Sequence, residues 1–268
     1  MINLGSITSK PNIGITSTHL SNTDHWDHFL ARVGYKRGEH RVVPGLYAIG
    51  NPTPESPVFV TANYTLSYDA LRSNLSGING YILVLDTQGV NVWCAAGKKT
   101  FGTEEVVIRV IATQLKQVVN HRVLILPQLG APGVAYQEVK KRTGFKVEFG
   151  PVRAADLPEY LKTHQATPAM RKVEFPLRDR IVLIPVDFVH LILPGVLVAL
   201  VVYFLLGGLL PALAVITILF SAGILFPILL PWLPSHNFST KGYFLGLLSA
   251  LPFAVSIFIK HPDWTWYH

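Results

Sequence analysis

Cysteine is almost absent from this 268-residue sequence, in which Cys94 is the only one. A single thiol cannot form a disulfide within the chain, and a lone free thiol is typical of a reducing compartment. Iron–sulfur clusters usually need about four thiolates, so we do not expect this chain to build one from its own side chains. A reducing cluster would have to come from another protein.

Charge is absent from most of the C-terminal third. No Asp, Glu, Lys or Arg lies between Asp187 and Lys241, and a second uncharged run covers residues 242–259. A helix needs roughly 20 apolar residues to cross a bilayer. We therefore expect an all-α transmembrane domain over residues 181–268. Its three spans are predicted near residues 188–206, 211–232 and 243–259.

Positive charge is concentrated in the rest of the chain. The formal net charge of +7 belongs to the residues before 181, and four basic residues shortly precede the first expected span: Arg171, Lys172, Arg178 and Arg180. By the positive-inside rule, this flank and the domain before it lie in the cytoplasm. The sequence thus predicts a multi-pass protein of the cytoplasmic (inner) membrane that contacts membrane lipid. We expect no nucleic-acid partner, because no nucleic-acid-binding motif is present.

Between residues 44 and 180, short apolar runs alternate with helix-like periodic segments. Strands are predicted at residues 58–61, 81–85, 123–126 and 145–149. One helix is predicted to have Ser67 as its N-cap and to reach Leu75, another to start at Thr103, and two more to cover 134–142 and 157–163. This alternation is typical of an α/β domain with a largely parallel, Rossmann-like sheet. Residues 1–43 are expected to form a polar N-terminal extension.

The predicted strand ends are the places to look for a ligand site. In open α/β sheets, ligands bind outside the carboxyl ends of the strands. Three segments fall there: residues 61–64, the residues after Asp86, and residues 127–133. Their small, hydroxyl or amide groups make four residues candidate ligand contacts: Thr61, Asn63, Gly130 and Gly133. For each one singly, ordinary turn chemistry is nearly as good an explanation.

Two histidines near the N-terminus, His25 and His28, have the spacing of metal ligands. Two such residues do not define a metal site by themselves, and a solvated loop or the start of a helix explains them more simply. We therefore assign no metal ion to this pair.

The single cysteine lies just beyond a predicted strand end, in the run Asn-Val-Trp-Cys-Ala-Ala-Gly-Lys at residues 91–98. Asn91 is a good N-cap and Gly97 a good C-terminal stop, which places Cys94 in the first turn of a short helix. Backbone N–H groups at that end of a helix favour the thiolate form of a cysteine. The alternative, a buried and inert cysteine, stays open on these grounds.

The neighbours of Cys94 bear on what it could bind. Lys98 adds positive charge, and the small Ala95, Ala96 and Gly97 would let a bulky flat ligand approach the backbone. A phosphate-binding loop is excluded at residues 97–100, because Val92 stands where that pattern needs a glycine. A cysteine hydrolase is not indicated, since the sequence places no histidine beside the thiol.

Residues 91–98 resemble the cap-helix signature of the mercury-methylating corrinoid protein family. The segments 60–64, 100–103, 126–133 and 143–147 also resemble that family, so that the similarity covers roughly residues 44–180. The same domain resembles the corrinoid-binding domain in the large subunit of the corrinoid iron–sulfur protein of the acetyl-CoA pathway. That relative lacks a cysteine at the cap-helix position, so Cys94 separates the two interpretations.

The resemblance implies a corrinoid (cobalamin-type cobamide) cofactor whose cobalt takes the Cys94 thiolate as its lower axial ligand. It further implies a methyltransferase that receives a methyl group from a methyltetrahydrofolate-type donor and passes it from methyl-Co(III) to Hg(II), forming methylmercury. An iron–sulfur ferredoxin-like partner would supply electrons and thiols. The residues implied to contact the corrinoid are those of the motif: Asn91, Val92, Trp93, Cys94, Ala95, Ala96, Gly97 and Lys98.

Two other functions remain open. One is a membrane-bound corrinoid methyl carrier of one-carbon metabolism, like that of the acetyl-CoA pathway, which does not act on mercury. The other is a cobamide-binding or scaffold protein without turnover.

Overall fold

The computed structural model describes residues 11–206 and 208–260. These residues form two compact units, which we describe separately. Residues 11–31 and 36–173 make up the first unit, and residues 32–35 and 174–260 make up the second. The predicted polar extension is therefore part of the first unit rather than an appendage, because it supplies strand β1 (Ile13–Thr16) and helix α1 (Asn22–Arg32).

A six-stranded sheet forms the centre of the first unit, in the order β1-β2-β4-β3-β5-β6. After β1 its strands are β2 (Gly45–Ile49), β3 (Val58–Ala62), β4 (Gly80–Leu85), β5 (Val123–Leu126) and β6 (Lys146–Phe149). Among these described strands every pairing is parallel except that of β2 with β4. The prediction of a largely parallel α/β sheet is confirmed, and β1 and β2 are additions to it.

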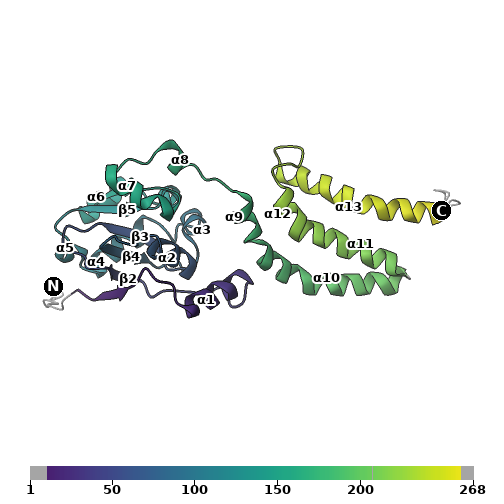
Figure 1. Ribbon diagram of the computed structural model, residues 1–268, viewed down its shortest axis with the longest axis horizontal. Coiled ribbons are helices and arrows are strands. Elements are labelled where there is room, and N and C mark those ends of the chain that lie inside the picture. The colour runs from purple at the N-terminus through teal and green to yellow at the C-terminus, as the bar shows by residue number, and fades with distance from the viewer. Residues whose placement is uncertain (1–10, 207, 261–268) are drawn as a thin grey trace, which may run out of the picture. The chain divides into compact units, whose positions relative to one another are not determined.

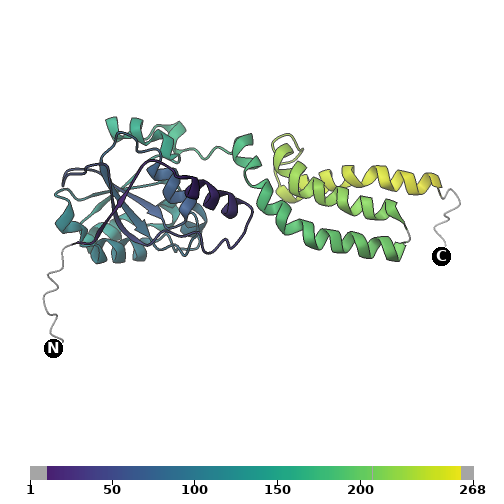
Figure 2. The ribbon, with the colours of Figure 1, turned by 60° about the horizontal axis from the view of Figure 1, so that its bottom comes forward.

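Helices cover both faces of the sheet (Figure 1, Figure 2). Successive residues of a strand point to opposite faces, and accordingly Leu83 joins one buried cluster while Ile82 joins the other. The first cluster includes residues of α4 (Thr103–Ala112) and α6 (Tyr136–Thr143), and the second includes residues of α2 (Thr65–Arg72) and α7 (Leu157–Thr163). Burial on both faces explains why β4 reads as a continuous apolar run.

Short helical segments complete this unit. They are α3 (Val92–Gly97), α5 (Leu115–Val118), α8 (Pro168–Arg171), and two 3-10 turns, η1 (Gln128–Gly133) and η2 (Ala154–Asp156). Helix α2 begins at Thr65 with Tyr64 as its N-cap, so the N-cap predicted at Ser67 is wrong by three residues.

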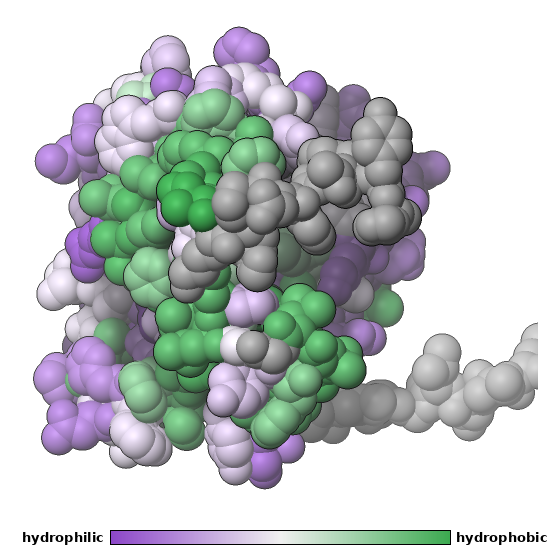
Figure 3. All heavy atoms as spheres, turned by 90° about the vertical axis from the view of Figure 1, so that its right-hand side faces the viewer, coloured by the Kyte–Doolittle hydropathy of each residue, from purple (hydrophilic) through white to green (hydrophobic). Residues whose placement is uncertain are grey.

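The second unit is entirely helical in its described part. It contains α9 (Leu177–Ile181), α10 (Ile184–Leu206), α11 (Leu209–Phe220), a π-helical turn η3 (Ser221–Leu225), α12 (Phe226–Leu229) and α13 (Phe238–Lys260). Figure 3, in which this unit faces the viewer, shows hydrophobic side chains over much of its surface. Leu205, Phe204 and Tyr243 are each about three-quarters exposed, at 78%, 77% and 74%.

Only some of the three predicted membrane spans correspond to helices that are long and apolar enough to cross a bilayer. Within the described residues, one helix, 209–229, is long and apolar enough to cross a bilayer. A second candidate exists only if the helices at 177–192 and 194–206, which are bent by 44° relative to each other, count as one span. Helix α13 is not among the candidates; it carries Lys241 near its start and Pro252 inside it. The all-α character is confirmed, whereas membrane insertion remains a prediction.

Arg180, which sequence analysis placed among the basic residues flanking a span, is buried in the second unit. Its Nη1 donates to the carbonyl oxygens of Pro227 and Ile228 at 3.2 and 2.6 Å, and its guanidinium lies 5.6 Å from the centre of the Trp232 ring. Lys241 donates to the carbonyl of Leu230 at 2.5 Å. Two cations thus satisfy carbonyl groups that the end of α12 leaves without helical partners.

Candidate functional site

The three segments singled out in the sequence meet at the carboxyl edge of the sheet. Strands β3 and β4 are parallel and in register, with Ala62 paired to Leu85, so residues 61–64 and the loop after Leu85 leave the sheet side by side. Strand β5 lies on the other side of β3 and continues into η1. Turn η1 packs against helix α3, which carries the cysteine. The three segments thus converge at one edge of the sheet, and ligand binding there stays a prediction.

Helix α3 begins as predicted. Asn91 is its N-cap, and the Asn91 side-chain oxygen accepts a hydrogen bond from the Cys94 N–H at 3.0 Å. The helix ends at Gly97, and Lys98 is its C-cap. Because this cap fixes the backbone at Cys94 itself, the motif sets the local conformation of the cysteine.

The thiol of Cys94 is exposed. Helix α3 buries Val92, Ala95 and Ala96 against the core and turns Trp93, which is 58% exposed, outward together with Cys94. A buried, inert cysteine is therefore excluded. Cys94 and Trp93 are therefore both accessible to a ligand outside the domain.

The small residues of the motif divide into two roles. Ala95 and Ala96 face the core, with exposures of 0% and 2%, so the expectation that they open the helix to a flat ligand is wrong for these two. Their small size instead allows close packing of α3. Gly97 does lie on the open side, and a Cβ added there would meet no atom within 4 Å. Gly97 is thus the position in α3 at which no side chain covers the backbone.

Gly130 and Gly133 are needed for packing in this structure. A Cβ on Gly130 would lie 2.5 Å from the Phe101 ring, and one on Gly133 would collide with the Phe101 carbonyl oxygen and lie 3.0 Å from the Cα of Ala96. Both glycines therefore let η1 approach α3 and the turn that follows it. Contact of either glycine with a ligand stays a prediction.

Asn63 is buried, with 2% exposure, and its side chain points into the loop between β4 and α3. The Asn63 Oδ1 accepts hydrogen bonds from the Thr87 N–H at 3.0 Å, the Thr87 hydroxyl at 2.9 Å and the Gly89 N–H at 3.0 Å. Its Nδ2 donates to Asp86 Oδ1 at 3.2 Å. Sequence analysis proposed Asn63 as a ligand contact; the structure gives it the task of fixing the loop that leads to Cys94.

Two other interactions hold the same loop, and no sequence pattern indicates either of them. Glu105 on α4 accepts the Asp86 N–H at 2.8 Å while it pairs with Arg109 at 2.7 Å. Arg41 lies over Gly89, where an added Cβ would be 2.9 Å from the Arg41 Nε. Gly89 also has a φ of +73°, a left-handed conformation that favours glycine. The loop is thus fixed by parts of the chain far from it in sequence.

A cavity of about 140 Å³ lies under this edge of the sheet. Thr61 and Val92 contribute to its wall, together with Val60, Leu126 and Pro127. Thr61 is buried, and its hydroxyl makes only a long hydrogen bond of 3.5 Å to the Ser67 carbonyl. Of the residues predicted at strand ends, Thr61 is therefore the one whose polar group borders a cavity.

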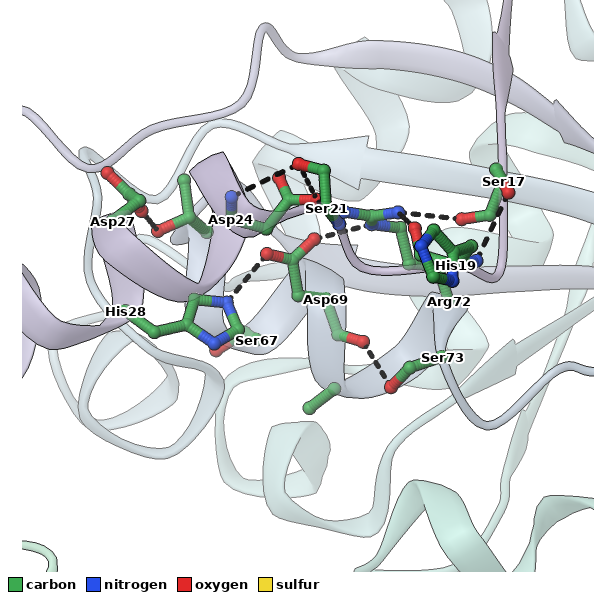
Figure 4. A network of polar contacts seen from close by, with 12 residues as sticks. Ser17, His19, Ser21, Asp24, Asp27, His28, Ser67, Asp69, Arg72 and Ser73 are labelled. Carbon is green, nitrogen blue, oxygen red and sulfur yellow. Dashed lines mark hydrogen bonds and ion pairs between the residues drawn. The ribbon is translucent and has the colours of Figure 1, made fainter.

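The histidine pair near the N-terminus has a structural role. The His28 Nε2 lies 2.7 Å from Asp69 Oδ2 (Figure 4), and the His25 and His28 rings meet edge to face with centroids 6.3 Å apart. In the part of the chain that the structure describes, no group of three or more His, Cys, Asp or Glu side chains is placed to hold a metal ion.

A mostly parallel α/β sheet with an exposed cysteine on a capped helix at its carboxyl edge is a Rossmann-like domain that presents an accessible thiol where such sheets bind ligands. The family model of the CO dehydrogenase/acetyl-CoA synthase delta subunit matches residues 36–161. The α/β domain is therefore related to subunits of CO dehydrogenase/acetyl-CoA synthase.

Curated relatives agree with this assignment. The acetyl-CoA decarbonylase/synthase complex subunit gamma of Archaeoglobus fulgidus is 36% identical over 124 residues, which are 46% of this chain and 26% of that protein. The subunit gamma of Methanopyrus kandleri is 36% identical over 128 residues, 47% of this chain and 27% of that one. That of Methanosarcina acetivorans is 28% identical over 157 residues, 57% of this chain and 31% of that one.

The chain spans about a quarter to a third of the length of these relatives. The resemblance to the acetyl-CoA pathway protein is confirmed for the α/β domain. The mercury-specific interpretation has no counterpart among these matches and stays a prediction.

Proposed function

We propose that the α/β domain binds a corrinoid, that the Cys94 thiolate is the lower axial ligand of its cobalt, and that the protein is a methyl carrier. The observation that carries this proposal is the exposed thiol of Cys94 at the carboxyl edge of the sheet, on a helix that Asn91 caps by accepting the Cys94 backbone N–H. Kinship with subunits of acetyl-CoA-forming complexes supports it. When bound, the corrinoid would supply a cobalt centre that accepts and releases a methyl group.

The residues present fit such a group. A tetrapyrrole-sized ring needs an accessible ligand atom and a bare surface beside it, and Cys94 and Gly97 provide these on one side of α3. Trp93 offers a flat apolar surface next to the sulfur. The cavity bordered by Thr61 is too small for the ring itself, so the ring would lie on the open side of the helix.

The acceptor of the methyl group has two candidates. The resemblance of residues 91–98 to the mercury-methylating family favours Hg(II) as the acceptor. Ligand chemistry agrees, because an anionic sulfur ligand donates electron density to a metal, as axial thiolates do in haem proteins. With the corrinoid bound, the Cys94 thiolate would supply this electron density, which would suit transfer of the methyl group to a soft cation such as Hg(II). One-carbon metabolism without mercury is the alternative, and the relatives identified above favour it.

Partners follow from the same chemistry. The only thiol of the chain is assigned to cobalt, and Hg(II) prefers thiolate ligands. An iron–sulfur, ferredoxin-like protein would supply both electrons and further thiols, and a methyltetrahydrofolate-type system would supply the methyl group. We also propose that the second unit anchors the chain in the cytoplasmic membrane, with the α/β domain in the cytoplasm. The apolar helix at 209–229 and the exposed apolar side chains support this anchor.

The cofactor assignment is tested by the ultraviolet–visible spectrum of the purified full-length chain with added cobalamin. We expect a spectrum of thiolate-ligated cobalt for the wild type, its loss in Cys94→Ala, and its retention in Ile108→Ala, which alters an exposed residue of α4. Identical spectra for wild type and Cys94→Ala would refute the proposal.

The acceptor is tested by an anaerobic assay of the membrane fraction with Hg(II) and a methyl donor. Methylmercury that disappears in Cys94→Ala supports mercury methylation. A chain that takes up the methyl group but forms no methylmercury supports the one-carbon alternative.

A further inference from the structure

The first unit has a second cavity, which lies at the edge of the sheet opposite to Cys94. Its volume is about 500 Å³, within the range of cavities that hold small-molecule ligands. Val58 and Val123 line it as the first residues of the parallel strands β3 and β5, and Ile78 lines it just before β4 begins. The amino ends of these strands therefore meet at this cavity, whereas Cys94 lies beyond the carboxyl end of β4.

Most of the wall of this cavity is apolar. Its apolar residues are Pro57, Val58, Ile78, Val123, Ile125 and Leu161. Ile78 and Leu161 are only partly buried against the second core cluster, so part of their apolar surface is available to a ligand in the cavity. Such a wall favours a ligand with a hydrocarbon or aromatic body.

The ionisable side chains of the wall are two acids, Glu55 and Glu148, and two histidines, His121 and His164. Among the residues that the structure describes, no lysine or arginine lines this cavity, although the formal net charge of the chain is +7. An acidic cavity in a basic domain favours a positively charged ligand.

Glu148 of β6 is the acid that is better shielded from water. Its side chain is 20% exposed, whereas Glu55 is an exposed residue. Burial alone would raise the pKa of Glu148, but hydrogen bonds from Lys146 and His164 outweigh it and hold the pKa below its ordinary value of 4.5. Glu148 is therefore a carboxylate at neutral pH, and a charge pair formed with it is less screened than one at Glu55.

An exposed lysine occupies one oxygen of this carboxylate. The Lys146 Nζ lies 2.9 Å from Glu148 Oε1, and the Lys146 side chain is 61% exposed. The His164 Nδ1 lies 3.3 Å from the other oxygen, Oε2. Ion pairs of exposed side chains are weak, so a ligand cation that enters the cavity can replace Lys146 at Glu148.

A metal ion is not the cation that this cavity fits. The His121 Nε2 donates to the Ser56 carbonyl at 2.9 Å, and its Nδ1 accepts the Val123 N–H at 3.3 Å, so neither ring nitrogen is left for a metal. No three metal-ligating side chains of the described residues are placed to hold an ion. The apolar wall and the acids together match an organic cation instead.

We propose that the cavity at the amino edge of the sheet binds a small organic cation, whose ammonium or guanidinium group pairs with Glu148 and whose apolar body packs against Ile78 and Leu161. This site goes beyond the methyl-carrier function and does not depend on it, because it lies at the opposite edge of the sheet from Cys94.

The test is ligand-observed saturation-transfer NMR with the full-length chain in detergent, and protein-free micelles serve as the blank. Three probes share a phenylethyl body and differ in charge: phenethylammonium, phenethyl alcohol and hydrocinnamate. We expect phenethylammonium to bind at least about tenfold more tightly than the neutral and the anionic probe, because a charge-assisted hydrogen bond is formed only by the cation. If phenethylammonium binds no better than phenethyl alcohol, the proposal is overturned.

Three variants assign the binding to this cavity. Glu148→Gln keeps the size of the side chain and removes its charge, so the preference for the cation should be lost. Glu138→Gln removes the same charge from α6, outside the cavity wall, and should bind phenethylammonium as the wild type does. Lys146→Gln removes the competing lysine and should bind it a few-fold more tightly, a gain that misfolding cannot produce. Wild-type affinity for phenethylammonium in Glu148→Gln would refute the site.

Discussion

Asn63 and Thr87 are joined by two hydrogen bonds that end on one oxygen atom, since the Asn63 Oδ1 accepts both the backbone N–H and the hydroxyl of Thr87, at 3.0 and 2.9 Å. This pair ties the end of β3 to the loop after β4, and that loop leads directly to the capped helix of Cys94. The buried side chain of Asn63 thereby helps to fix the position of the Cys94 thiol.

Replacement of Asn63 should disturb the site through this loop. Asn63→Ala leaves the buried N–H of Thr87 and the partly buried N–H of Gly89 without this acceptor, which costs about 1–3 kcal/mol for a buried group. We expect a lower free energy of unfolding by denaturant and a weaker thiolate-ligated cobalamin spectrum. Asn63→Asp keeps the acceptor but brings a second carboxylate next to Asp86. If cobalamin ligation were unchanged in both variants, Asn63 would have no positioning role.

Two glycines offer a matched pair of substitutions. Gly133→Ala forces a Cβ onto the Phe101 carbonyl and the backbone of Ala96, so we expect it to destabilise the domain by about 1–3 kcal/mol, as overpacking does. Gly97→Ala meets no neighbour and should leave stability unchanged within about 1 kcal/mol. Cobalamin titration should nevertheless show weaker binding for Gly97→Ala. Equal cobalamin affinity in Gly97→Ala and the wild type would mean that the cofactor does not approach α3 there.

Cys94→His changes the charge of the proposed cobalt ligand and keeps a ligand atom. The exposed position should accommodate the larger ring. We expect the variant to bind cobalamin but to transfer a methyl group to Hg(II) at least about tenfold more slowly, the equivalent of about 1.4 kcal/mol in the barrier. Parallel assays with Hg(II) and with a thiol acceptor would separate loss of electron donation from a general defect. A variant as fast as the wild type with Hg(II) would refute the role given to the thiolate charge.

The attachment of α1 should depend on pH through Asp24. Burial alone would raise the pKa of this carboxyl, but hydrogen bonds from Ser21 and the contact with Arg72 outweigh it and hold the pKa below its ordinary value of 3.8. A carboxyl whose pKa is lowered by folding stabilises the folded state above its unfolded pKa, and that contribution is lost as the pH falls through the folded value. We therefore expect α1 to loosen only below pH 3.8.

The mobility of a spin label at His25→Cys in a Cys94→Ser background, followed from neutral pH into this acid range, measures the loosening. Asp24→Asn removes the titrating group and serves as the control, in which the label should lack this acid transition. An identical transition in the control would assign the loosening to other carboxyl groups.

Sequence patterns predicted those strands and helix caps that depend on residues close together in the chain. The apolar run that became β4 and the cap at Asn91 were found because strand burial and helix capping leave signals within a few residues. The inward turn of Ala95 and Ala96 was missed because a six-residue helix is too short to show a face. The task of Asn63 was missed because its partners lie more than twenty residues away along the chain.

Strands β1 and β2 were missed for a related reason. β2 is a short segment, Gly45–Ile49, without clear alternation, and it becomes a strand by pairing with β4 on one side and β1 on the other. The membrane helices were predicted from length and composition, which do not register the bend of 44° between the helices on either side of residue 193.

The pairing of β1 with β2 has a practical consequence for anyone who shortens the protein. A chain that starts at residue 44, where composition alone suggests that the domain begins, would lose the strand that covers the outer side of β2. The unpaired N–H and C=O groups of β2 would then be free to recruit a strand from another molecule. Such a fragment should precipitate or self-associate, whereas one that keeps residues 11–173 should remain dispersed.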